Sequence, residues 1–96
     1  MARTPEGKVK DAISAVLRER GIWYFLPANN GFGKHGIPDY ICCLNGKFLA
    51  IEAKAPGKRS NTSELQDHTI SDIKGHNGLA VVIDDVSQLE AFLNEL

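Results

Sequence analysis

The feature that most constrains this chain is the pair Asn45-Gly46, which lies between two apolar-rich runs, Asp39 to Leu44 and Lys47 to Lys54. Asn-Gly between such runs is the strongest short-range signal for a two-residue β-hairpin, because both turn positions need positive φ. In a hairpin closed by these two residues, Asp39 faces Glu52. The sequence therefore predicts two antiparallel strands that bring two carboxylates opposite each other.

The segments around the hairpin predict three helices and two further strands. Thr4-Pro5 and Ser63-x-x-Gln66 are typical helix starts, and Gly21 is a typical helix end. The helices are expected from Thr4-Pro5 to Gly21, from Ser63 to about Gly75, and from a second capping box at Ser87 with the apolar stripe Leu89, Phe92, Leu93 and Leu96; the strands are expected at Ile22 to Leu26 and at Leu79 to Ile83, the latter buried on both faces. The order αβββαβα predicts an α/β fold, with a mixed sheet flanked by helices in which the last two strands are parallel.

A chain of 96 residues is expected to form one domain over residues 1–96. It has no apolar run long enough to span a bilayer, and its N-terminus has no signal-peptide pattern, so a cytoplasmic location is expected. Cys42 and Cys43 are neighbours that would point to opposite faces of a strand, which favours two small apolar side chains over a disulfide or zinc site.

The formal net charge of −1 is unevenly distributed along the chain. Residues 1–60 carry ten Lys/Arg against five Asp/Glu, a net +5, and residues 61–96 carry one against seven, a net −6. This asymmetry leaves room for a basic surface that contacts phosphates. The basic loop residues that flank the hairpin are candidate phosphate contacts: Lys34, His35, Lys58 and Arg59.

The stretch Gly31 to Gly36 matches the G-x-G-x-x-G pattern of dinucleotide-binding loops. Such a loop needs a helix directly after it, because the helix N-terminus holds the pyrophosphate. Here Ile37-Pro38 and the hairpin strand follow instead. We therefore expect no nucleotide cofactor, and we interpret these glycines as a tight loop in which backbones approach closely.

One face of the predicted hairpin ends in Asp39, Glu52 and Lys54. Two carboxylates placed opposite each other repel unless a cation lies between them. Lys54 alone could supply that charge in a structural ion pair. A divalent cation is the functional alternative, because Mg²⁺ binds one or two carboxylates together with water and phosphate oxygens and can activate a bound water. Lys54 would then orient that water or offset negative charge in the transition state.

Two further residues allow two interpretations each. Glu6 lies two helical turns before Ile13 on the same apolar stripe, which favours a role in the site, but a first-turn acid also stabilises the helix dipole. Gln66 is fully explained as the capping-box partner of Ser63, and a supporting role in the site is the less specific alternative.

These residues resemble a known signature. Pro38-Asp39 followed by Glu52-Ala53-Lys54 is similar to the PD-(D/E)xK pattern of the restriction-endonuclease-like nucleases. With Glu6, Gly36-Ile37-Pro38 and Gln66, nearly the whole chain resembles the virus-type replication-repair nuclease (VRR-NUC) domain. The resemblance implies that Asp39, Glu52 and Glu6 are metal ligands, that Lys54 is the catalytic lysine and that Gln66 supports the site.

The resemblance further implies an Mg²⁺- or Mn²⁺-dependent DNA endonuclease of the Holliday-junction-resolvase type, a homodimer that cuts branched DNA in DNA repair. The apolar strand from Ile22 to Leu26 could supply a dimer interface, or it could belong to the core. The alternative function is a non-catalytic nucleic-acid-binding or assembly module with the same fold, which would bind DNA without a divalent ion.

Overall fold

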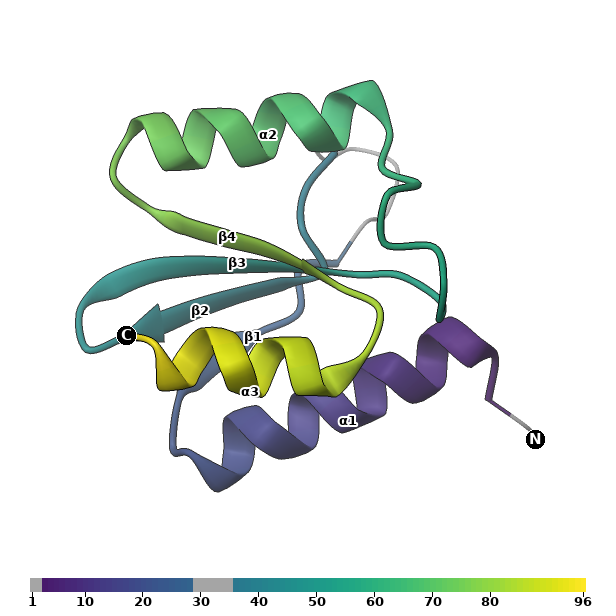
Figure 1. The fold of residues 1–96 in the computed structure, drawn as a ribbon. Helices are drawn as coiled ribbons and strands as arrows, with labels where there is room; N and C mark the ends of the chain where they lie inside the picture. The colour runs from purple at the N-terminus through teal and green to yellow at the C-terminus, as the bar shows by residue number, and fades with distance from the viewer. Residues whose placement is uncertain (1–2, 29–35) are drawn as a thin grey trace.

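The computed structural model describes residues 3–28 and 36–96, whose helices and strands follow the predicted order (Figure 1). The elements are α1 (Pro5–Glu19), β1 (Trp23–Phe25), β2 (Tyr40–Leu44), β3 (Lys47–Ala53), α2 (Glu64–Gly75), β4 (Leu79–Ile83) and α3 (Val86–Asn94). The strands form one four-stranded sheet in the order β1-β2-β3-β4. The pair β3 and β4 is parallel and the other pairs are antiparallel, which confirms the predicted mixed sheet.

The sheet is covered by α1 and α3 on one face and by α2 on the other (Figure 1). The face toward α1 and α3 carries the core, because alternate residues of β2 and β3 point there. The buried cluster between this face and the two helices consists of Val9, Ile13, Val16, Leu17, Tyr40, Cys42, Leu49, Ile51, Ala53, Ile83, Leu89 and Leu93. The opposite face of β2 and β3 therefore points toward the side on which α2 lies.

The hairpin has the predicted turn and register. Asn45 and Gly46 both have positive φ, at 52° and 83°. The pairs run from Leu44 with Lys47 to Tyr40 with Ile51, so that the next position along brings Asp39 opposite Glu52. The neighbouring cysteines point to opposite faces as expected, with Cys42 buried and Cys43 exposed.

The starts of α1 and α2 are also as predicted. Thr4 caps α1 by accepting a hydrogen bond from the Gly7 amide at 3.0 Å. Ser63 and Gln66 form the reciprocal capping box at the start of α2. These contacts are local, so the sequence alone determines them.

The predicted start of α3 is wrong. Its N-cap is Asp85, two residues before Ser87, and the Asp85 carboxylate accepts hydrogen bonds from the amide and the hydroxyl of Ser87. A carboxylate at this position satisfies the first free amides of the helix, so the Ser87 hydroxyl is no longer needed as a cap. The predicted apolar stripe also loses its last member, because α3 ends at Asn94 and Leu96 is exposed.

Both edge strands are more exposed than a core strand would be. β4 was expected to be buried on both faces, but Leu79, Val81 and Val82 are only half-buried because the strand lies at one edge of the sheet. β1 lies at the other edge and leaves Trp23 and Phe25 exposed, so the core alternative for this strand is wrong for these two side chains. Across residues 3–28 and 36–96, no helix has both the length and the apolarity needed to cross a membrane.

Candidate active site

The candidate site begins with Asp39 and Glu52 at one end of the β2–β3 hairpin. Asp39 directly precedes β2, and its Oδ2 accepts a hydrogen bond from the amide of Ala53 at 2.8 Å. This bond fixes the carboxylate against the end of β3. Glu52 is 5% exposed and lies close enough to Asp39 for the Asp39 carboxylate to raise its pKa. The two carboxylates therefore meet, as the register predicts.

The buried position of Glu52 and the nearby Asp39 change the pKa of Glu52. Burial and, next to it, the neighbouring Asp39 carboxylate together raise the pKa of Glu52 from its ordinary value of 4.5 to about 8. Lys54 and Lys10 act in the opposite direction. Glu52 therefore retains a proton near neutral pH because two adjacent carboxylates in a desolvated place cannot both ionise freely.

This donor set fits a divalent cation. Two carboxylates that share a proton offer oxygen ligands of the kind that Mg²⁺ and Mn²⁺ prefer, and a cation can replace the shared proton. Among the described residues, no group of three or more His, Cys, Asp or Glu side chains lies close enough to hold a metal by itself. The protein would therefore supply two carboxylates, and the remaining ligands would be water or substrate oxygens.

Lys54 follows β3 directly, and its Nζ donates a hydrogen bond to Oε1 of Gln66 at 2.9 Å. The same Gln66 oxygen accepts the amide of Ser63 at 2.9 Å to close the capping box. The two interpretations of Gln66 are thus compatible, because a carbonyl oxygen has two lone pairs. One residue both starts α2 and holds the amine that stands beside the carboxylates.

Glu6 is linked to Asp39 through Lys10, a residue that the sequence analysis missed. Nζ of Lys10 lies 3.7 Å from Oε2 of Glu6 and 3.4 Å from Oδ1 of Asp39. A signal existed, because Lys10 is one helical turn after Glu6 and therefore shares its face of α1. The role of Glu6 as a metal ligand stays a prediction.

A comparison with known proteins identifies the family. No protein-family model matches the chain. The chain is 30% identical over 86 residues to "Putative nuclease p44" of Acyrthosiphon pisum secondary endosymbiont phage 1, covering 88% of this chain and 89% of the phage protein. The chain belongs to the same family as this nuclease. With 86 residues matched, the similarity extends over most of this nuclease-family chain.

The remaining predicted site residues of this nuclease-family chain are scattered. Lys34 and His35 lie outside the described residues. Lys58 and Arg59 are exposed in the loop between β3 and α2. Nε of Arg59 donates to the carbonyl oxygen of Val82 at 2.8 Å, so this side chain is held against β4. A phosphate contact by any of the four stays a prediction.

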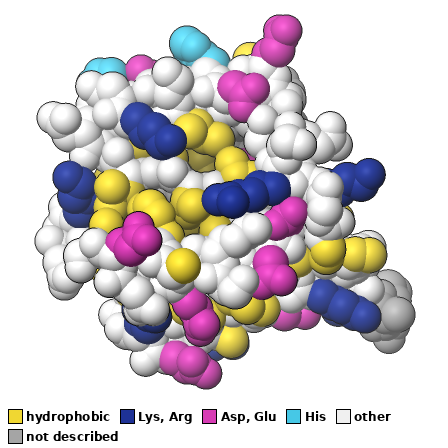
Figure 2. Space-filling view, viewed as in Figure 1, with side chains coloured by type: hydrophobic (Ala, Val, Ile, Leu, Met, Phe, Trp, Pro, Cys, Tyr) yellow, Lys and Arg dark blue, Asp and Glu magenta, His cyan; other side chains and the backbone are white. Residues whose placement is uncertain are grey.

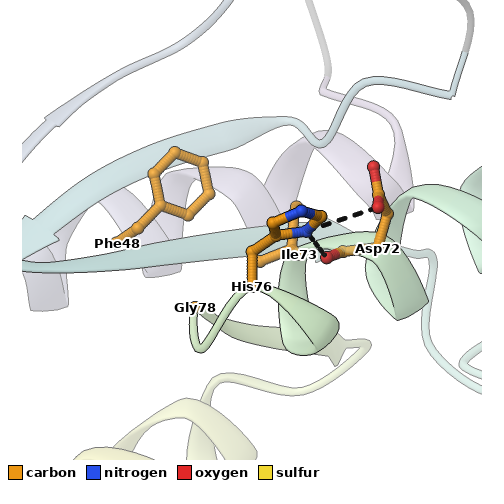
Figure 3. A pocket seen from close by; sticks show the side chains of 5 residues that line it. All are labelled: Phe48, Asp72, Ile73, His76 and Gly78. Atoms are coloured by element: carbon orange, nitrogen blue, oxygen red, sulfur yellow. Dashed lines mark hydrogen bonds and ion pairs between the residues drawn. The ribbon is translucent and has the colours of Figure 1, made fainter.

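A hollow elsewhere on the surface contains none of the predicted site residues. It has a volume of about 350 Å³ and is lined by Phe48, Asp72, Ile73, His76 and Gly78 (Figure 3). Its rim carries an exposed pair in which Nδ1 of His76 lies 3.4 Å from Oδ1 of Asp72. Figure 2 shows an apolar area on the viewed side of the molecule, with Lys, Arg, Asp and Glu side chains around it.

Proposed function

We propose that this protein is a metal-dependent DNA nuclease of the VRR-NUC type, with its active site at Asp39, Glu52 and Lys54. The observation that carries the proposal is the carboxylate pair at the end of the hairpin, the buried Glu52 and the partly exposed Asp39, with an amine beside it. Membership in a nuclease family supports the same reaction class. An Mg²⁺ or Mn²⁺ ion bound there would supply an activated water and neutralise charge on the phosphate.

Each residue of the candidate site has a definite task in this proposal. Asp39 is held rigid by the Ala53 amide and presents its Oδ1 to the cation. Glu52 presents the second carboxylate from a buried position, where low dielectric strengthens its attraction to a cation. Gln66 fixes Nζ of Lys54, so that the amine can orient the attacking water or offset charge on the phosphate.

We further propose that the protein acts as a homodimer on branched DNA. Trp23 is 62% exposed, and Phe25 and Leu26 are also exposed beside it. The rings of Trp23 and Phe25 lie 5.7 Å apart in an edge-on arrangement, so they form one apolar surface on an edge strand. Such a surface, with a strand edge available for pairing, favours association with a second copy. A two-fold dimer would present two active sites to a symmetric four-way junction.

The test compares cleavage of a four-way junction, a flap and a plain duplex in Mg²⁺ or Mn²⁺. We expect Lys54→Ala and Asp39→Ala to lower the cleavage rate at least about 100-fold, because both remove direct stabilisation of the transition state. Lys47→Ala is the matched control, since Lys47 is an exposed lysine at the opposite end of β3. Equal cutting by wild type and Lys54→Ala would reject the assignment, and metal-independent binding without cutting would favour the binding-module alternative.

Sedimentation of wild type and Trp23→Ser tests the dimer separately. We expect wild type to sediment as a dimer and the variant to shift toward monomer. A wild-type monomer that still cuts DNA would reject the dimer and leave the active site in place.

A further inference from the structure

Lys10 on α1 lies between two carboxylates of the candidate site, and the proposed hydrolysis does not use it. Its Nζ lies 3.4 Å from Oδ1 of Asp39 and 3.7 Å from Oε2 of Glu6. The Lys10 side chain is 28% exposed and that of Asp39 is 23% exposed. A pair this shielded interacts more strongly than a fully exposed pair, because water screens it less.

The contacts of Asp39 show which of its two oxygens Lys10 and a metal ion would share. Oδ2 of Asp39 already accepts the Ala53 amide at 2.8 Å. Oδ1 is therefore the oxygen best placed to bind a cation, and it is the oxygen that Lys10 faces. An ammonium group and a divalent ion would thus compete for the same carboxylate oxygen.

The backbone of Lys10 is held in place by a buried contact. Oη of Tyr40 donates to the carbonyl oxygen of Lys10 at 2.8 Å and lies 2.7 Å from Oγ of Ser14. Tyr40 follows Asp39 in the chain, and its side chain is fully buried. The helix that carries Lys10 is therefore fixed to the strand that Asp39 directly precedes. The Lys10–Asp39 pair is thus better supported than the exposed pair of Arg3 and Asp11.

We propose that Lys10 is an internal counter-ion that occupies the cation position at Asp39 and competes with a divalent metal ion for it. This inference rests on the proposed metal site. Without a metal, the Lys10 charge stabilises the protein by offsetting part of the negative charge of Asp39 and Glu6. With a metal, the same charge repels the incoming ion. Lys10 therefore acts in opposite directions on the two states, stabilising the metal-free protein and weakening metal binding.

The test is a Mn²⁺ titration of the full chain without DNA, by calorimetry and by thermal denaturation. We expect Lys10→Met to lower the melting temperature in EDTA and yet to bind Mn²⁺ roughly three- to tenfold more tightly, as expected for removal of one nearby, partly screened charge. Lys10→Arg keeps the charge and is expected to resemble wild type. Lys8→Met is the matched control, because Lys8 is an exposed lysine on α1. Lys10→Gln provides a second neutral variant in case Lys10→Met does not fold.

The outcomes separate this inference from the proposed function. If Mn²⁺ binds wild type but not Glu52→Gln, and the neutral Lys10 variants bind it no more tightly than wild type, the role of Lys10 is overturned and the metal site stands. If Mn²⁺ binds neither wild type nor any Lys10 variant, the metal site itself is rejected. A merely structural role would lower the melting temperature in EDTA without tightening Mn²⁺ binding, so the opposite signs are the diagnostic result.

Discussion

Gly36 lies directly against the backbone of Leu65, at the start of α2. A Cβ on Gly36 would stand 2.7 Å from the carbonyl carbon and oxygen of Leu65, a distance that side chains essentially never adopt. Gly36 also has a φ of 79°, which disfavours any residue with a side chain. This contact joins the segment that leads to Asp39 to the helix that carries Gln66, so the two halves of the site depend on it.

Gly36→Ala should therefore destabilise the protein more than its backbone conformation alone requires. Gly57 is the matched control, because its φ is 81° and nothing lies within 4 Å of the added Cβ. We expect Gly57→Ala to cost about 1 kcal/mol from left-handed strain, and Gly36→Ala to cost at least about 1 kcal/mol more from overpacking. Urea unfolding measures both, and equal losses in the two variants would contradict the close approach.

The two tasks of Gln66 can be separated by mutation. Ser63→Ala and Gln66→Ala each remove part of the capping box, so each should lower the free energy of unfolding by about 1 kcal/mol. Only Gln66→Ala also removes the Oε1 atom that holds Nζ of Lys54. We expect roughly a 10- to 100-fold loss of cleavage rate for Gln66→Ala alone, because Lys54 is misplaced. Equal activity in both variants would mean that Gln66 serves only as a helix cap.

The raised pKa of Glu52 predicts how stability depends on pH without metal. The folded protein binds a proton at Glu52 with a pKa of about 8, whereas the unfolded chain releases it near the ordinary value of 4.5. The contribution of Glu52 to stability is therefore fully present below the unfolded value and is lost as pH rises toward 8. The slope is at most about 1.4 kcal/mol per pH unit in this window.

Glu52→Gln should remove this part of the pH dependence, because glutamine does not titrate. Urea unfolding in EDTA measures the slope at several pH values between about 5 and 8, a range that lies within the titration window of Glu52. Glu90→Gln is the control, since Glu90 is exposed on α3. The same slope in wild type and Glu52→Gln would show that Glu52 does not hold the proton.

The hydroxyl of Tyr40 provides a test of how α1 is attached to the sheet. Tyr40→Phe removes the hydrogen bonds to the Lys10 carbonyl and to Ser14 without changing the ring. We expect a loss of about 1–2 kcal/mol in the free energy of unfolding, typical of a lost hydrogen bond in a shielded place. Tyr24→Phe is the control, because its hydroxyl accepts only a long, exposed bond from Arg18 at 3.3 Å. Equal effects would mean that the Tyr40 hydroxyl does not anchor the helix.

Much of the site could be predicted because its geometry is local. The Asn45-Gly46 turn fixes which residues face each other along the hairpin, so Asp39 and Glu52 meet for reasons contained in a short segment. The capping box likewise places Gln66 at the start of α2 from a pattern of four residues. In both cases the interacting groups are a few residues apart or are linked by a tight turn.

The tertiary structure alone decided the contacts between distant segments. Lys10 approaches Asp39 because α1 packs across the sheet; helical spacing places Lys10 on the same face of α1 as Glu6, but it does not say that this face comes within reach of Asp39. Trp23 and Phe25 are exposed because β1 lies at an edge, a position that depends on strand order rather than on apolar content. The burial that raises the pKa of Glu52 likewise depends on how the whole chain packs. Local patterns thus determined the partners within each segment, and long-range packing determined the charge and exposure of the site.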